Sequence, residues 1–313
     1  MKHLFWRAQI SILRAFPPLS GVVSTVSMGA ANSRRVWLKT FFLMLFRVPM
    51  ALLSHLRNKC TNRVVLSRIS VPVTTRCTLH CDKCAAHVPD LAQPHDVPAE
   101  QLIADAKALF FCVDHVYATI FSGGEAFLHP QLDEIIMTYA SFNRSSSTSV
   151  QTNGTLLPNA KVIAALKATN ATVKISNYPS QLQPNVEQLK SQLREHGIRF
   201  THASGTFWCD VGQLGVAQSG CAKRRFSTCI QQLCLPYYKG NLHLCGESFI
   251  LLEENQANIP PQDYINLHTS TPQTFAKQLR QLLRKRHIKA CDYCLGYTCD
   301  ALKIPIAEQR ERS

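Results

Sequence analysis

Three cysteines lie close together at Cys77, Cys81 and Cys84, with the spacing C-x3-C-x2-C. Thiolates bind both iron–sulfur clusters and zinc, and a short loop lets three of them converge on one metal centre. Structural zinc sites usually combine two C-x2-C pairs, so this triplet favours an iron–sulfur cluster over zinc. A four-iron cluster that is held by only three cysteines keeps one iron open for a ligand that is not protein.

Further polar groups follow at regular intervals along the chain. Ser122-Gly123-Gly124-Glu125 combines paired glycines, which let backbone amides approach a ligand, with a carboxylate that accepts from an ammonium group. Gln151-Thr152-Asn153-Gly154-Thr155 and Ser176-Asn177 each end a later apolar segment. Asn and Ser also cap helices without any ligand, so a binding role and a capping role both remain open.

An alternation of short apolar segments and amphipathic helices would position these groups. The sequence predicts strands at Val64–Val73, Val116–Phe121, a segment ending at Ser149–Gln151, Thr172–Ser176 and Ile198–Thr201. It predicts helices at Pro98–Val113, Pro130–Tyr139, a segment opening near Pro158, and Pro184–His196. Such alternation predicts an α/β fold with a parallel sheet, whose ligands gather at the carboxyl ends of the strands. The cysteine loop and the polar groups all lie at these ends.

The order of these motifs resembles the radical S-adenosylmethionine (SAM) superfamily, and Phe127-Leu128-His129-Pro130 is similar to the family's usual continuation after GGE. The resemblance implies a partial (β/α)6 TIM-like barrel, a [4Fe-4S] cluster on Cys77, Cys81 and Cys84, and SAM at the open iron. In that comparison Gly124 and Glu125, with Gly123 beside them, would bind the SAM amino group. Asn153, Ser176 and Asn177 are further candidates for contact with SAM. Lys83 departs from the family pattern, in which this residue is commonly aromatic and lies beside the adenine.

A second group of cysteines lies in the last third of the chain, at Cys229, Cys234, Cys245, Cys291, Cys294 and Cys299. Their spacing around Gly240 resembles the twitch form of the SPASM extension, which implies one auxiliary [4Fe-4S] cluster. Cys234 competes with Cys229 as a ligand, and Cys299 could replace Cys291 or Cys294. A zinc site is the alternative. We expect a hairpin-like stretch over Leu235–Leu252 and a basic helix over Phe275–His287 to position these cysteines.

Length and composition limit the class of protein. The chain has 313 residues, of which 46% are hydrophobic, as expected for a globular protein with a sizeable core. Its 13 cysteines are clustered in a chain too long for a small secreted disulfide scaffold. This pattern favours metal ligation in a reducing compartment, with the cytoplasm as the expected location. We expect three parts: an N-terminal extension (1–60), a radical SAM core (61–204) and an auxiliary-cluster region (205–313).

Charge is concentrated at the N-terminus. Of the net +14, +12 comes from residues before Asp82, where twelve Lys and Arg occur without Asp or Glu. The other residues carry only +2, so the basic balance gives weak support for nucleic-acid binding, and we expect no nucleic-acid partner. The apolar run Trp37–Phe46 is too short for a confident transmembrane helix. Two interpretations of residues 1–60 remain open: a helix that lies on an anionic membrane surface, and a helix that packs against the barrel. A twin-arginine signal, a transit peptide and a secretory signal are minority interpretations of the same segment.

The resemblance implies a reaction type. A flavodoxin- or ferredoxin-type donor would reduce the cluster, SAM would be cleaved to a 5′-deoxyadenosyl radical, and the radical would abstract a hydrogen atom from substrate. We expect oxidation or epimerisation of a polyol- or sugar-like small molecule, with Cys209 or Cys221 as hydrogen donors in an epimerisation. Maturation of a ribosomally made peptide is the second interpretation. A non-catalytic zinc- or RNA-binding protein is the alternative from another class.

Overall fold

A computed structural model describes residues 63–298 and 300–311. The expected N-terminal extension, with its membrane-surface and targeting interpretations, and the candidate ligand Cys299 lie outside these residues. Among the helices that are described, none is long and apolar enough to cross a membrane.

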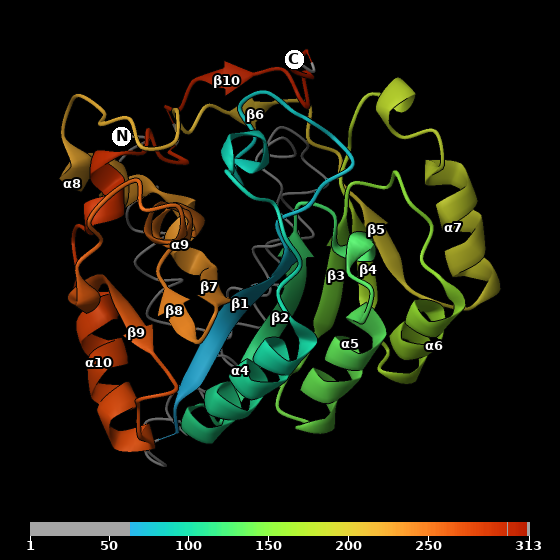
Figure 1. Ribbon diagram of the computed structural model, residues 1–313, viewed down its shortest axis with the longest axis horizontal. Coiled ribbons are helices and arrows are strands. Elements are labelled where there is room, and N and C mark those ends of the chain that lie inside the picture. The colour runs from blue at the N-terminus through green and yellow to red at the C-terminus, as the bar shows by residue number, and fades with distance from the viewer. Residues whose placement is uncertain (1–62, 299, 312–313) are drawn as a thin grey trace, which may run out of the picture.

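Five parallel strands alternate with four helices and form the centre of the molecule (Figure 1). The strands are β1 (Val65–Thr74), β2 (His115–Gly123), β3 (Thr148–Thr152), β4 (Thr172–Ile175) and β5 (Phe200–His202). The helices are α4 (Ala99–Cys112), α5 (Leu132–Ser141), α6 (Ala160–Ala168) and α7 (Val186–Glu195). The strands pair in chain order, and the helices lie on one face of the sheet, so the predicted α/β class with a mostly parallel sheet is confirmed.

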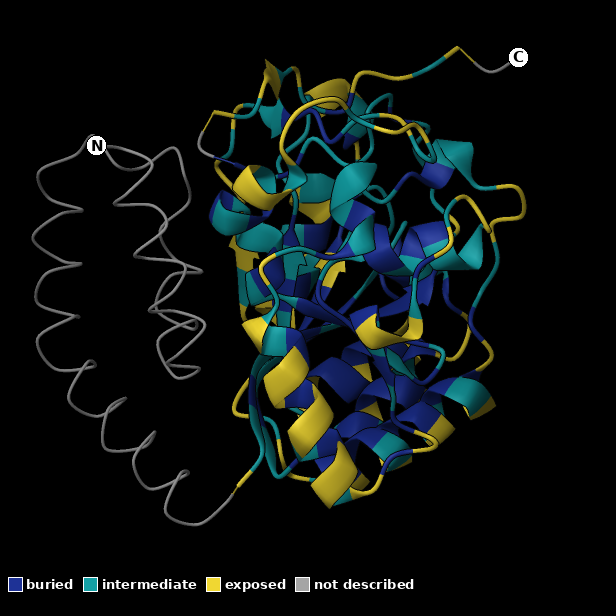
Figure 2. Cartoon of the chain, turned by 90° about the vertical axis from the view of Figure 1, so that its left-hand side faces the viewer, coloured by how far each residue is buried: buried dark blue, intermediate teal, exposed yellow. Residues whose placement is uncertain are grey.

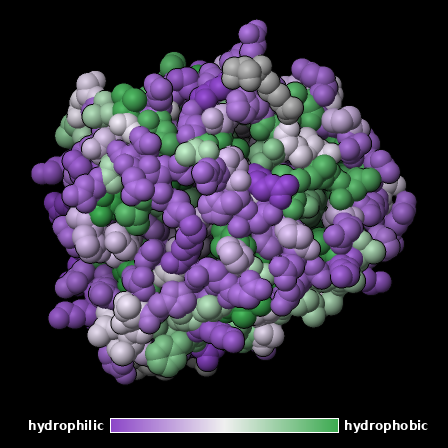
Figure 3. Space-filling model, in the orientation of Figure 1, coloured by the Kyte–Doolittle hydropathy of each residue, from purple (hydrophilic) through white to green (hydrophobic). Residues whose placement is uncertain are grey.

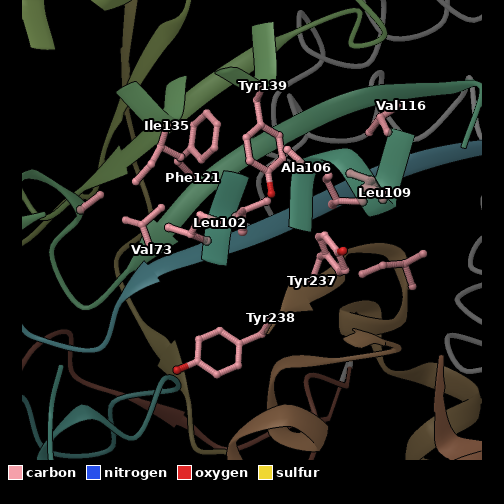
Figure 4. Packing of buried hydrophobic residues seen from close by; sticks show 14 of the residues in the cluster. Val73, Leu102, Ala106, Leu109, Val116, Phe121, Ile135, Tyr139, Tyr237 and Tyr238 are labelled. Carbon is pink, nitrogen blue, oxygen red and sulfur yellow. The ribbon is translucent and has the colours of Figure 1, made fainter. Parts of the chain in front are cut away.

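Alternation within the strands explains which face the helices cover. In β1, Ile69, Val71 and Val73 are fully buried and belong to the hydrophobic core, whereas the residues between them point to the other face of the sheet. Leu102 and Leu109 of α4 belong to the same core (Figure 4). Burial of such aliphatic side chains contributes about 1.5–3 kcal/mol each. The core therefore lies between the sheet and its helices and fixes the level at which the strands end.

The sheet continues on the other side of β1. Strand β7 (Leu235–Tyr238) pairs with β1 in parallel, with Ile69 opposite Leu235, and β8 (Asn241–His243) and β9 (Tyr264–Asn266) follow in antiparallel order. The sixth parallel strand of the sheet is therefore β7 beside β1. Tyr237 ties this part to α4, because its hydroxyl donates to the backbone oxygen of Asp105 at 2.8 Å.

The predicted hairpin over Leu235–Leu252 is correct only in its first half. The turn is where the sequence places it, at Lys239 and Gly240, which both have positive φ. After β8, however, the chain enters helix α9 (Gly246–Glu253). Short apolar runs such as Phe249–Leu252 do not distinguish a strand from a buried helix by periodicity, and here the run packs as a helix against β7 and β8.

The remaining elements surround the C-terminal half. Helix α8 (Ala222–Thr228) precedes β7, and α10 (Pro272–Arg284) packs against α4 with Phe275, Leu279 and Leu282 buried. Figure 2 shows the buried interior and the exposed outer residues of the helices, and the face in Figure 3 is mostly hydrophilic. Two short strands, β6 (Trp208–Cys209) and β10 (Lys303–Ile304), pair above the carboxyl ends of the main strands (Figure 1).

Candidate active site

The first three cysteines lie on the loop that leaves the carboxyl end of β1. Cys81 is buried, and Cys77 and Cys84 are partly buried. Burial raises the pKa of all three thiols, and the nearby Cys84 adds to the rise at Cys77 and at Cys81, whose pKa is about 11. Because Cys84 raises the pKa of both other thiols, the three cysteines are close together, and a cationic centre would stabilise their thiolate forms. This donor set therefore fits a metal cluster.

Two glycines let the end of β2 approach the cysteine loop closely. A Cβ atom on Gly124 would lie 2.2 Å from the backbone oxygen of Arg76 and 2.8 Å from the Cβ of Cys77. The Glu125 amide donates to the Arg76 oxygen at 2.8 Å. A Cβ on Gly123 would similarly meet the oxygen of Thr74. The Gly-Gly pair therefore sets the position of the loop that carries Cys77.

Glu125 is fully buried and joins the ends of β2 and β3. Its carboxylate accepts from the Phe127 amide at 3.0 Å, from the Thr152 hydroxyl at 2.9 and 3.0 Å, and from the Asn153 amide at 2.7 Å. Burial raises its pKa, and these hydrogen bonds act in the opposite direction. In this arrangement the carboxylate holds the ends of β2 and β3 together. Its contact with an ammonium group of SAM stays a prediction.

Asn153 brings the end of β3 to the cysteine loop. Its Nδ2 atom donates to the Thr78 hydroxyl at 2.9 Å and lies 3.6 Å from the Cys77 sulfur. Ser176 and Asn177 follow β4: the Ser176 amide donates to the Thr152 oxygen, and Asn177 Nδ2 donates to the Gly205 oxygen. The polar residues predicted from the strand ends therefore lie at one edge of the sheet, and Asn153 directly contacts the cysteine loop.

Two aromatic residues near this loop were not predicted from the sequence. Tyr178 follows Ser176-Asn177 and is hydrogen-bonded to Ser176, and its ring meets Trp208 edge-on with 5.8 Å between centroids. Burial raises the pKa of Tyr178, and the charges of the three cysteine thiolates raise it further. The position of Tyr178 directly after a predicted strand end was the available signal.

Four of the later cysteines line one cavity, which we call the second cavity because it belongs to the second group of cysteines. Cys229 is the C-cap of α8, Cys245 is the N-cap of α9, and Cys291 and Cys294 follow α10. Burial raises the pKa of each thiol, and that of Cys245 rises further through Cys291, Cys294 and Cys229. No three of the described His, Cys, Asp or Glu side chains are placed to share a single metal ion. The four cysteines line the cavity from three separate segments. A [4Fe-4S] cluster takes one ligand at each of its four separate irons, so four cysteines suit a cluster better than a single ion.

The other predicted cysteines lie apart from this cavity lining. Cys234 is close to Arg68 and Lys174, whose charges lower its pKa against the effect of burial. Cys209 is buried on β6, where its charge affects Cys229 and Tyr297, while Cys221 is exposed at the N-cap of α8. Of the two candidate ligands Cys229 and Cys234, only Cys229 lines this cavity.

The two cysteine sites are neighbours. Tyr297 lines the second cavity, and its pKa is raised by burial and then by the charges of Cys209, Cys84, Cys294 and Cys229. This one side chain therefore lies within electrostatic reach of both cysteine groups. The sequence offered no signal for it beyond its closeness to Cys294.

The chain resembles several solved structures. The alignment with anSMEcpe, solved with AdoMet and the Kp18Cys peptide bound, has 20% identity and a TM-score of 0.38 over 46% of this chain and 44% of that one. The alignment with Streptococcus suis SuiB bound to S-adenosylmethionine has 15% identity and a TM-score of 0.38, and it covers 50% of this chain and 38% of SuiB. The alignment with BtrN in complex with AdoMet and 2-DOIA has 16% identity and a TM-score of 0.44, and it covers 75% of this chain and 95% of BtrN. The chain thus spans less than half the length of anSMEcpe and SuiB in these alignments.

No match was found among curated proteins. The family model described as Radical SAM superfamily matches residues 71–190. This range contains the three cysteines of the first loop, the Gly-Gly-Glu motif and the polar ends of β3 and β4. The chain therefore contains a radical SAM domain over residues 71–190.

Proposed function

We propose that this protein is a two-cluster radical SAM enzyme that oxidises a small polar substrate held near both clusters. The observation that supports the proposal is the second cavity, which four cysteines from three separate segments line together close to the first cysteine loop. In this proposal Cys77, Cys81 and Cys84 hold the first [4Fe-4S] cluster, and residues 205–313 form the auxiliary-cluster domain.

The first cluster would serve SAM. When bound by Cys77, Cys81 and Cys84, a reduced cluster would supply the electron for cleavage of SAM to methionine and a 5′-deoxyadenosyl radical. The chain's own residues would position the cofactor: Asn153 and Glu125 fix the loop and the strand ends, and Gly123, Gly124, Ser176 and Asn177 lie at the same edge. Tyr178 and Trp208 would exclude water from the space beside the loop.

The four-cysteine set would serve oxidation. Cys229, Cys245, Cys291 and Cys294 would supply all four protein ligands of a [4Fe-4S] cluster, which would leave no iron open for the substrate. In a dehydrogenation, the substrate would lose one hydrogen atom, one proton and one electron, and a cluster held by these four cysteines would supply the electron acceptor. For epimerisation, a thiol would return a hydrogen atom, and Cys209 is better placed for this than the exposed Cys221.

A polar inner face supports a polyol- or sugar-like substrate. Ser70 and Ser122 lie on the face of β1 and β2 away from the helices, with their hydroxyl oxygens 2.6 Å apart. Lys174 lies between the core residues Val173 and Ile175 of β4, so it points to the same inner face. Hydroxyls and an ammonium suit a hydroxylated substrate better than an apolar one. A flavodoxin- or ferredoxin-type donor and a cytoplasmic location belong to the same proposal.

The test is cleavage of SAM by the full chain after anaerobic reconstitution with iron and sulfide. We expect 5′-deoxyadenosine and methionine to form in the presence of a chemical reductant, and to be lost in Cys84→Ala but kept in Cys112→Ala. Cys112 is the matched control because it is buried on α4, away from both cysteine groups. Carbon-deuterated polyols, aminocyclitols and peptides can then be compared: deuterium in 5′-deoxyadenosine from peptides alone would contradict the small-molecule assignment. Equal cleavage in Cys84→Ala would contradict the assignment of Cys84 to the first cluster, and no cleavage by the wild type would contradict the enzyme assignment.

A further inference from the structure

The C-terminal segment returns to the first cysteine loop after passing the second cavity. Beyond Cys294 the chain forms β10, which pairs with β6, and residues 307–310 then lie along the loop. We refer to residues 307–310 as the C-terminal strap. The Asp82 amide donates to the Glu308 oxygen at 2.5 Å, and the Arg310 amide donates to the His80 oxygen at 2.8 Å. Figure 1 shows this end of the chain above the carboxyl ends of the strands.

The side chain of Gln309 is directed at one of the cluster cysteines. Its Nε2 atom donates to the Cys81 sulfur at 3.1 Å and to the Ala307 oxygen at 2.7 Å. Its Oε1 atom accepts from the His80 amide at 2.9 Å. Because both ends of the amide have partners, the group is fixed with an N–H toward the sulfur, although other atoms of Gln309 are exposed.

Two further features hold the strap in this place. Arg310 Nε lies 2.9 Å from Asp82 and its NH1 atom lies 2.7 Å from Asp90, so one guanidinium joins the segments on either side of Cys84. Ala307 is buried with φ of 55°, a left-handed conformation that costs a non-glycine residue free energy and persists only where the surroundings determine it. The strap is therefore held independently of the Gln309–sulfur contact.

An N–H donor to a ligating sulfur changes the electronic properties of an iron–sulfur cluster. Reduction adds negative charge that spreads onto the cysteine sulfurs, and a hydrogen bond from a neutral amide stabilises that charge. Such outer contacts tune a metal site as well as orienting its ligands. An amide that is aimed at one sulfur of the first cluster should therefore make that cluster easier to reduce.

We propose that Gln309 is a positioning residue that donates a hydrogen bond to the cluster-bound sulfur of Cys81 and raises the reduction potential of the first cluster. Arg310 keeps the strap on the loop. The inference rests on the proposed function in one respect, namely that Cys77, Cys81 and Cys84 hold the cluster. It assigns a role to a residue that lies more than 200 positions from those cysteines in the sequence.

The test is the midpoint potential of the first cluster in the reconstituted full-length protein. A redox titration followed by electron paramagnetic resonance measures this potential. The signal to follow is the one that changes when SAM is added, because that change identifies the first cluster. Gln309→Leu removes the donor, and Gln309→Glu keeps an acceptor for His80 while placing a carboxylate oxygen toward the sulfur. We expect a more negative potential in both, with the larger shift in Gln309→Glu, and an unchanged iron content. Gln273→Leu, an exposed change on α10, should match the wild type.

Equal potentials in wild type, Gln309→Leu and Gln309→Glu, with the SAM-responsive cluster intact, would overturn the role of Gln309 and leave the proposed function standing. A wild-type protein that lacks any SAM-responsive cluster would overturn both. If Gln309→Leu lost iron, Gln309→Glu would decide the matter, because it retains the bond to the His80 amide.

Discussion

The Nε2 atom of His87 lies 3.0 Å from Oε2 of Glu247, and this buried contact joins the two cysteine sites. His87 follows Cys84 on the first loop, and Glu247 follows Cys245 at the start of α9. The other oxygen of Glu247, Oε1, has no hydrogen-bond partner among the described residues, and Glu247 lines the second cavity. A direct contact between two side chains therefore links the two sites.

Replacing His87 should weaken this link. His87→Asn is the informative change, because His87 has φ of 49° and Asn tolerates this left-handed conformation. The change leaves the buried Glu247 carboxylate without its partner, so we expect a loss of about 3 kcal/mol in the free energy of unfolding, measured with urea. His115→Asn, on the strand β2, is the control and should cost far less. A loss below about 0.5 kcal/mol in His87→Asn would contradict the link.

The same pair predicts a pH dependence. Burial lowers the pKa of His87, but the contacts with Glu247 and Asp90 outweigh it, so the pKa lies above its ordinary value of 6.5. The folded state therefore binds the proton more tightly than the unfolded state, and the stabilisation is full below pH 6.5 and is lost as the pH rises through the folded pKa. The difference in unfolding free energy between wild type and His87→Asn should shrink above pH 6.5. A difference that grew with pH would show that the sign is wrong.

A methyl group at Gly124 should displace the cysteine loop. Its Cβ would lie 2.2 Å from a backbone oxygen, which cannot move as a flexible side chain could. We expect Gly124→Ala to lose most of the iron of the first cluster after reconstitution. Gly205→Ala is the matched control, since a Cβ there meets nothing within 4 Å. Full iron content in both variants would contradict the close approach.

Glu125 should contribute to the stability of the fold as well as to the site. In Glu125→Gln, the amide nitrogen would face donors from Thr152 and from the backbone, so at least one buried donor would lose its acceptor. We expect a loss of about 2 kcal/mol in unfolding free energy. The exposed Glu187→Gln on α7 should change the unfolding free energy far less. Equal effects of the two changes would contradict the role of Glu125 in holding β2 and β3 together.

The two candidate ligands Cys229 and Cys234 can be separated directly. Cys229 lines the cavity with the other three cysteines, whereas Cys234 lies by Arg68 and Lys174. Cys229→Ala should therefore lose about four iron atoms per chain, and Cys234→Ala should retain them. The reverse result would move the fourth ligand to Cys234.

Local sequence patterns predicted the parallel βα units and the first cysteine loop, because periodicity and spacing are local properties. The polar residues at the ends of β3 and β4 were also predicted, because parallel strands end at one edge. Long-range packing was not predictable in the same way. The pairing of β7 with β1, the helix α9, and the contact of Gln309 with Cys81 depend on the whole fold. Tyr178 and Tyr297 likewise become site residues only when distant segments meet.

The most direct test of the two-cluster account is the amount of iron and acid-labile sulfide per chain after anaerobic reconstitution. The account predicts about eight of each in the wild type and about four in the protein with Cys77, Cys81 and Cys84 all changed to Ala. Loss of all iron and sulfide from that variant would show that the later cysteines hold no cluster. Zinc without sulfide in both proteins would contradict the account as a whole.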